Sequence, residues 1–180
     1  MAATEKLIRT YDINLCAFME LNFNWSKVNS SANLASWLQD EERELRSITA
    51  HNTSESAETL GKHQPGGTGM ICRHEFIQYA RKPSVDPRGL GRWCSWPFSC
   101  NPIHVTRIVV AYRPCQRKSK GLKTIYQQHM RYIQLRGLQT DPTTLFDADL
   151  SQQIKEWRGA GERIVLVIDV NSHPLYNNLY

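Results

Sequence analysis

Acidic, amide and phenolic side chains follow three apolar segments of the chain, at the points where we expect β-strands to end. Glu20 follows one such segment, Tyr112 follows a second, and Asp169 and Asn171 follow a third. Burial of such groups costs free energy unless they are paired or bind a cation. Two carboxylates that converge at strand ends offer the hard oxygen ligands that Mg²⁺ prefers. Taken singly, each carboxylate is better explained as a cap of a neighbouring helix or turn.

The strands that would position these side chains are indicated by short apolar or alternating runs. The runs cover residues 13–19, 70–72, 92–98, 105–111 and 163–168. The last of them is uninterrupted, which predicts a strand buried on both faces of a sheet. A shorter strand is expected near Ile48.

Helical spacing of apolar residues predicts helices at 4–11, at 34–45 after two serines, and at 122–133. A further helix begins after Asp141, an N-cap followed by proline, and ends at Gly159. This order of elements predicts a layered α/β domain in which strands pack beneath helices. The length of 180 residues fits one such domain, residues 1–180.

Charge is distributed unevenly along the chain. The formal net charge is +5, but residues 61–140 carry fourteen basic and two acidic side chains. Such a segment suits a polyanion such as nucleic acid or a phosphorylated substrate, and suits a solvated basic surface equally well. The sequence shows no run of the roughly 20 apolar residues that a membrane span needs. The N-terminal residues lack the apolar core of a signal peptide, so we expect an intracellular protein, nuclear or cytoplasmic and not secreted.

The five cysteines show no close pairing, which favours reduced and mostly buried thiols over a disulfide framework. Cys94, Cys100 and His104 could meet at a metal, but their spacing matches no common zinc site.

Four motifs in order resemble those of the endonuclease/exonuclease/phosphatase superfamily of metal-dependent phosphodiesterases. The motifs are Phe18-Met19-Glu20, Gly66-Gly67-Thr68-Gly69, Ala111-Tyr112-Arg113-Pro114 and Ile168-Asp169-Val170-Asn171. The segment 92–96 looks most like endonuclease domains of retrotransposon type. The resemblance covers nearly the whole chain and implies a layered β-sandwich flanked by helices.

The resemblance also implies roles for the residues of these motifs. Glu20 would be the ligand of Mg²⁺, with Mn²⁺ as the alternative cation. Tyr112 would donate to the scissile phosphate, Asn171 would position the phosphate and the attacking water, and Asp169 would activate that water. Such a site would hydrolyse phosphodiesters, because it combines a cation, a placed nucleophile and donors aimed at developing charge.

Basic residues of the middle segment would then follow the phosphate backbone of nucleic acid, with DNA favoured. The candidates are Arg73, Arg81, Lys82, Arg88, Arg92, Arg113, Arg117, Lys118 and Lys120. Two other functions remain open at this point. One is a catalytically inactive domain that only binds nucleic acid, and the other is a phosphatase of the same superfamily that acts on small phosphorylated molecules or lipids.

The chain departs from the family pattern at both ends. The first strand, which bears an asparagine, and the last strands, which bear an aspartate and a histidine, are not found, and Ile168 stands where the family has glycine. We therefore expect an incomplete sandwich with impaired activity. Unpaired sheet edges in such a sandwich predict self-association.

Overall fold

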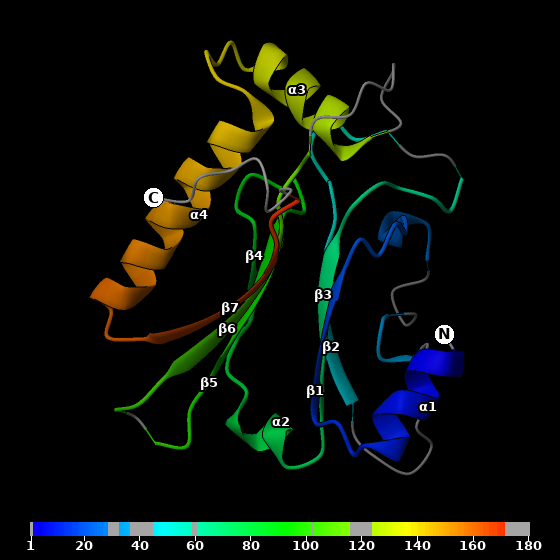
Figure 1. Ribbon diagram of the computed structural model, residues 1–180, viewed down its shortest axis with the longest axis vertical. Helices are drawn as coiled ribbons and strands as arrows, with labels where there is room; N and C mark the ends of the chain where they lie inside the picture. The colour runs from blue at the N-terminus through cyan, green and yellow to red at the C-terminus, as the bar shows by residue number, and fades with distance from the viewer. Residues whose placement is uncertain are drawn as a thin grey trace.

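Two β-sheets pack face to face and helices cover their outer faces, so the protein belongs to the mixed α/β class (Figure 1). The computed structural model describes residues 2–28, 33–36, 45–58, 61–101, 103–115 and 124–171. The helices are α1 (Ala2–Thr10), the 3₁₀ turn η1 (Trp25–Lys27), α2 (Phe76–Tyr79), α3 (Ile125–Leu135) and α4 (Pro142–Gly159). The strands are β1 (Leu15–Met19), β2 (Leu45–Ala50), β3 (Thr68–Arg73), β4 (Ser84–Val85), β5 (Trp93–Phe98), β6 (Thr106–Tyr112) and β7 (Arg163–Asp169).

The three-stranded sheet has the order β1-β3-β2, with both neighbours antiparallel to β3. Every residue of β3 is buried, as expected of a central strand that is covered on both faces. Met19 at the end of β1 pairs with Thr68 at the start of β3. The segment after β1 and the turn before β3 therefore meet at one end of this sheet.

The four-stranded sheet has the order β4-β5-β6-β7. Its first three strands are antiparallel, whereas β6 and β7 are parallel and are connected through α3 and α4. A parallel pair needs a crossover of this kind, because the chain must return to the starting end of the sheet. The register places Tyr112 beside Asp169, so the last residues of both strands lie at the same end.

The main core lies between the sheets and includes Met70, Cys94, Trp96 and Val110, each of which is almost completely buried. A second core joins the four-stranded sheet to α4, where Phe146 packs against strand residues of β5 and β6. Burial of one large apolar side chain contributes roughly 1.5–3 kcal/mol. The two cores therefore fix α4 and both sheets as successive layers, and α1 covers the opposite face (Figure 1).

Several predicted elements are confirmed to within a few residues, and α4 shows why. Asp141 accepts hydrogen bonds from the backbone N–H groups of Thr143 and Thr144, at 2.9 and 3.1 Å, which makes it the N-cap. The helix ends at Gly159, and Gly161 follows with a φ of +83°, a conformation that favours glycine. The predicted helix at 34–45 has its centre at 37–44, outside the described residues, and Leu45 begins β2 instead.

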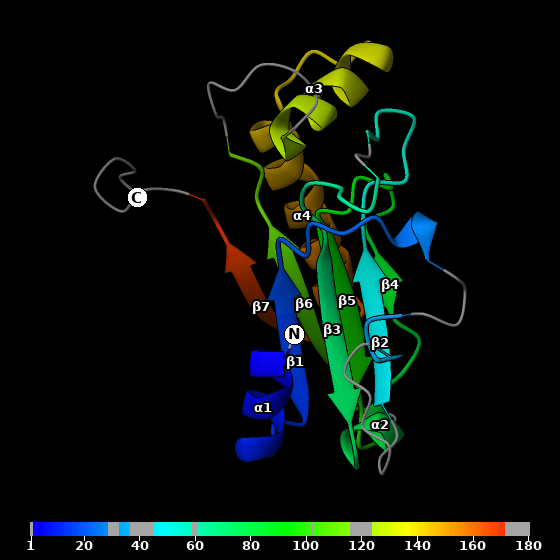
Figure 2. The ribbon, with the colours of Figure 1, turned by 90° about the vertical axis from the view of Figure 1, so that its right-hand side faces the viewer.

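The prediction that strand 163–168 is buried on both faces is wrong. The strand β7 lies at an edge of its sheet, and Val165, Leu166 and Val167 are 48%, 39% and 36% exposed (Figure 2). Among the described residues, the contacts between the two sheets lie mainly at β5 and β6, and β7 lies beyond them at the edge. Apolar composition alone does not distinguish an edge strand from a central one.

No helix in the described parts of the chain is long and apolar enough to cross a membrane.

Candidate active site

A hydrogen bond between Tyr112 and Glu20 joins the two sheets at one end of the molecule. The Tyr112 hydroxyl donates to Oε1 of Glu20. Tyr112 is the last residue of β6, and Glu20 directly follows β1, which contacts β6 across the core. The fold thus brings together two of the residues that the sequence placed at strand ends, although 92 positions separate them.

The glycine turn before β3 holds the segment that carries Glu20. Backbone N–H groups of Leu21 and Asn22 donate to the carbonyl oxygens of Gly67 and Gly66, at 3.2 and 2.8 Å. Gly66 has a φ of +82°, and a Cβ there would lie 2.4 Å from the side chain of Ile125. The left-handed backbone conformation favours glycine at this position, and the turn fixes the position of Glu20.

Asp169 and Asn171 lie beside Tyr112 on the β7 side, at the same end of the sheet, but neither lines the cavity next to Glu20. Asp169 is the register partner of Tyr112, so their side chains lie on the same face of the sheet. The Asp169 carboxylate accepts from the backbone N–H of Asn171 at 2.9 Å, and Nδ2 of Asn171 donates to the carbonyl oxygen of Arg113 at 2.7 Å. Asn171 has a φ of +48°, so the chain turns sharply here and directs its side chain back to β6.

Tyr112 is buried and remains protonated at neutral pH. Burial raises the pKa of its hydroxyl above the ordinary value of about 10, and the hydrogen bond to the Glu20 carboxylate raises that pKa further. A hydrogen bond with the Asn171 side chain acts in the opposite direction. The site therefore contains a phenolic O–H donor beside a carboxylate.

A cavity of about 220 Å³ opens beside this pair. Glu20 and Tyr112 line it together with four polar residues that sequence reasoning did not select: Asn22, His63, Cys115 and Thr124. Two of these lie close in sequence to the motifs, since Asn22 follows Glu20 by two positions and Cys115 follows Tyr112 by three. His63 lies in a segment without periodic pattern, and Thr124 is the N-cap of α3, near the start of the predicted helix 122–133. Neither position carries a chemical motif, so only the fold reveals them.

The oxygen ligands at this cavity would suit a cation that has one protein ligand and takes its other ligands from water and substrate. No group of three or more His, Cys, Asp or Glu side chains that could hold a metal occurs among the described residues. Mg²⁺ nevertheless binds commonly through one or two carboxylates, with waters and substrate phosphates as its other ligands. Glu20 is exposed, and a carboxylate that accepts one hydrogen bond keeps further acceptor capacity. Glu20 therefore fits Mg²⁺ as a single protein carboxylate ligand.

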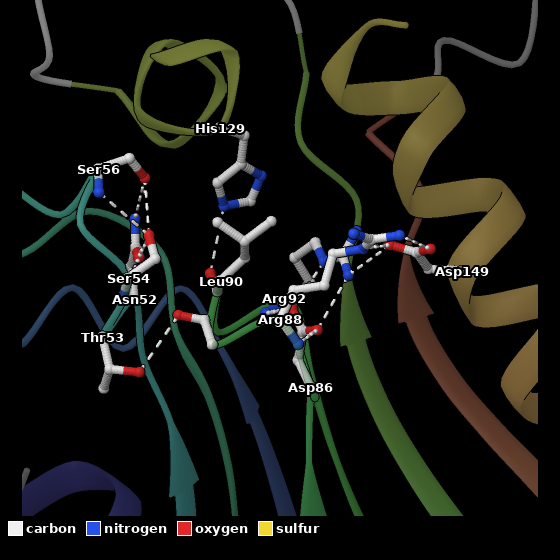
Figure 3. Close-up of polar contacts among 11 residues, drawn as sticks. Asn52, Thr53, Ser54, Ser56, Asp86, Arg88, Leu90, Arg92, His129 and Asp149 are labelled. Atoms are coloured by element: carbon white, nitrogen blue, oxygen red, sulfur yellow. Dashed lines mark hydrogen bonds and ion pairs between the residues drawn. The ribbon is translucent and has the colours of Figure 1, made fainter. Parts of the chain in front are cut away.

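Two of the nine predicted phosphate-binding residues belong to the protein interior. Arg92 is 0% exposed and donates to Asp86 at 2.7 Å and to Asp149 at 2.9 Å (Figure 3). Arg73 is buried and donates to the carbonyl oxygens of Ile8 and Ile13. A phosphate backbone cannot reach either guanidinium without rearrangement of the fold, so we remove both from the candidate contact surface.

Two further arginines near the site are paired with acidic residues of α4. Arg88 forms an ion pair with Asp149 at 2.5 Å, and Arg113 forms one with Asp147 at 2.7 Å. The helix α4, which follows the basic segment 61–140, thus supplies carboxylates that neutralise part of the positive charge of that segment. This pairing could not be foreseen from charge counts along the chain.

The remaining five basic candidates fall into two groups. Arg81 and Lys82 are exposed, but the backbone of Arg81 pairs with Pro97, at the end of β5 opposite to Tyr112. That end is roughly 17 Å away, because each strand residue rises about 3.3 Å. The last three lie outside the described residues: Arg117, Lys118 and Lys120.

The cysteines are free, as predicted, but the prediction that most of them are buried is wrong, because only Cys72 and Cys94 are buried. Cys100 is exposed, and no metal cluster within the described ranges includes it, Cys94 or His104.

A scan against models of known protein families gives no match, and no curated protein matches the chain. The function must therefore be argued from the residues of the site.

Proposed function

We propose that the cavity between β1 and β6 is the active site of a Mg²⁺-dependent hydrolase of phosphate esters, with a phosphodiester as substrate. The observation that supports this most directly is the contact between Tyr112 and Glu20. It places a neutral hydrogen-bond donor and an exposed carboxylate on the same cavity, at the end of the sheet where Asp169 also lies. A donor beside a cation ligand is what a transferring phosphoryl group requires.

Each residue has a separate task in this proposal. Bound Mg²⁺, held by Glu20, would neutralise charge on the phosphate oxygens. When substrate binds, the Tyr112 O–H turns from Glu20 to a phosphate oxygen, and the raised pKa of Tyr112 keeps that proton in place at neutral pH. Asp169 accepts a proton from the attacking water, while Asn171 orients the carboxylate through its backbone N–H. The water oxygen would bond to phosphorus as the P–O bond to the leaving group breaks, and the leaving group would depart as an alcohol after it takes a proton from solvent.

Nucleic acid is the first candidate for the substrate, because Arg113 lies next to Tyr112 and residues 61–140 are strongly basic. A second candidate is a small phosphorylated molecule. It is favoured by the ion pairs that occupy Arg88, Arg92 and Arg113, which reduce the positive charge offered to a long polyanion. Salt dependence separates the two. Binding to a phosphate backbone releases bound counterions, and added salt makes that release less favourable, so the affinity falls steeply.

The test is hydrolysis by the purified chain of two substrates, supercoiled plasmid DNA and bis(p-nitrophenyl) phosphate, with and without Mg²⁺. Glu20→Gln keeps an oxygen that can accept from Tyr112 but removes the negative charge. We expect this variant and Asp169→Asn to lose turnover while folding normally. The matched control is Glu156→Gln on the exposed face of α4, which should retain full activity.

Three outcomes decide between the functions. Mg²⁺-dependent nicking that Glu20→Gln abolishes supports a nuclease, and turnover of bis(p-nitrophenyl) phosphate alone supports a phosphodiesterase of small molecules. Salt-sensitive DNA binding without turnover in the presence of any divalent cation would indicate a DNA-binding domain instead of an enzyme. Turnover that is equal in the wild type and in Glu20→Gln would contradict the proposed site.

A further inference from the structure

The strand β7 presents an open hydrogen-bonding edge. Within the described residues it pairs with β6 alone, and it is the outermost strand of its sheet, with α4 behind the sheet rather than over this edge (Figure 2). Three consecutive apolar residues, Val165, Leu166 and Val167, are exposed there. An exposed apolar edge strand is a template on which another strand can pair.

The backbone bonds to β6 show which residues face outward. The N–H of Arg163 donates to Val105, and the carbonyl of Asp169 accepts from the N–H of Arg113. Because N–H and C=O of one strand residue point to the same side, the odd-numbered residues 163–169 face β6. The N–H and C=O groups of Ile164, Leu166 and Ile168 therefore point to the open edge.

The sequence of β7 is symmetric about Leu166. It reads Arg-Ile-Val-Leu-Val-Ile-Asp, so the apolar residues repeat in reverse order and the two ends carry opposite charges. In an antiparallel pairing of two copies about Leu166, each residue meets its mirror position. Ile164 would lie opposite Ile168 of the second copy, and Arg163 would lie opposite Asp169 of the second copy.

We propose that this protein forms a symmetric dimer in which the β7 strands of two copies pair antiparallel, centred on Leu166. The outward-facing residues of the two strands then form the hydrogen-bonded pairs, and this alternation matches the antiparallel pattern. Arg163 and Asp169 lie on the same face of the sheet, because both are odd-numbered, so each can pair with its opposite charge in the other copy. The two four-stranded sheets become one continuous sheet, and the interface is isologous.

This pairing also brings a residue to the candidate active site. Arg163 of the second copy approaches Asp169, the residue that follows the apolar part of β7. The dimer depends on the β7 edge and its charges alone and is independent of the proposed hydrolase activity. Its test accordingly measures mass and not turnover.

Sedimentation or light scattering of the full chain at micromolar concentration tests the proposal. We expect a dimer of twice the chain mass of 20.8 kDa. Leu166→Pro removes an N–H that points outward and leaves the bonds to β6 intact, since proline is tolerated at an edge strand. This variant should raise the dissociation constant roughly tenfold or more, with the circular dichroism spectrum unchanged.

A matched pair of lysine variants controls for loss of apolar surface. Leu166→Lys should yield a monomer, because a charge in the middle of an edge strand opposes pairing. Val85→Lys changes a residue of similar exposure, 44% against 39%, on β4 at the other edge of the same sheet. The Val85 variant should remain a dimer. Equal effects of both lysines would overturn the proposal.

The register is tested by exchange of the end charges. Arg163→Asp and Asp169→Arg should each weaken the dimer, since each places like charges opposite one another. The double variant restores opposite charges and should recover most of the lost affinity. A monomeric wild type, or a dimer that neither Leu166→Pro nor the single charge variants weaken, would overturn the proposal.

Discussion

Two groups of charged and polar residues lie side by side at one end of the four-stranded sheet and differ in how their charges are balanced. In the ion-pair cluster of Asp86, Arg88, Arg92 and Asp149, every member has a partner of opposite charge (Figure 3). In the site cluster of Glu20, Tyr112, Asp169 and Asn171, the carboxylates accept only from neutral donors in the bonds described. The clusters adjoin, since the N–H of Tyr112 donates to the carbonyl of Arg92 at 2.8 Å.

The difference follows from burial. Arg92 and Asp86 are both completely buried, and two charges removed from water must satisfy one another. Glu20 is exposed, so water solvates its charge and a ligand can reach it. The ion-pair cluster therefore fixes the loop before β5 to α4, whereas the site cluster keeps charge available for binding.

The largest expected effect is on the ion-pair cluster. Arg92→Met should lower the free energy of unfolding by about 3–5 kcal/mol, because it leaves the buried Asp86 carboxylate without its cation. Chemical denaturation at neutral pH measures this. The control is Arg81→Met, whose side chain is exposed, and it should unfold like the wild type. A loss for Arg92→Met no greater than that of the control would contradict the structural role.

The site cluster should respond in activity and not in stability. Tyr112→Phe removes the hydroxyl that donates to Glu20, and we expect turnover of bis(p-nitrophenyl) phosphate to fall by about 10²-fold, as for loss of one donor to developing charge. The midpoint of denaturation should shift much less in Tyr112→Phe than in Arg92→Met. The reverse pattern, a large loss of stability with full activity, would remove Tyr112 from the active site.

His129 links stability of the ion-pair cluster to pH. Burial and then the positive charge of Arg92 lower the pKa of His129 from its ordinary value of 6.5 to about 3. The unfolded chain therefore binds a proton below pH 6.5 that the folded protein excludes. Stability contributed by the neutral ring is complete above pH 6.5 and falls, by up to about 1.4 kcal/mol per pH unit, until about pH 3.

Denaturation at several pH values, with His129→Gln as the variant, checks this dependence. The glutamine amide can still donate to the Leu90 carbonyl, which lies 3.2 Å from the ring nitrogen. We expect its stability to decline less steeply on acidification, whereas the exposed His104→Gln control follows the wild type. Parallel curves for all three proteins would show that His129 is not the group responsible.

The smallest effect concerns the boundary between the clusters. Asp147→Asn releases Arg113 from a half-exposed ion pair, at a cost in stability of less than about 1 kcal/mol. The freed guanidinium belongs to the residue that follows Tyr112 and should raise phosphate-ligand affinity a few-fold. Titration with inorganic phosphate at low salt measures it, and unchanged affinity would show that Arg113 does not face the ligand.

Local pattern was enough to predict the elements whose signals are contained in a few neighbouring residues. The N-cap Asp141, the β-branched run of β6 and the apolar run of β7 each determine their structure through backbone geometry and side-chain size within one segment. The same holds for the positions of Glu20, Tyr112 and Asp169, because strand ends can be located in sequence.

The tertiary structure alone decided which charges are available and which edges are open. Arg92 and Arg81 are both arginines of the basic segment, and the sequence does not distinguish their roles. In the structure Arg92 is buried between two aspartates, whereas Arg81 is exposed. Likewise the sequence of β7 is that of a buried strand, and only the packing of the sheets leaves it at an edge. Burial and electrostatic pairing depend on residues far apart in the chain, so the sequence determined the elements and their chemistry, and the packing determined their roles.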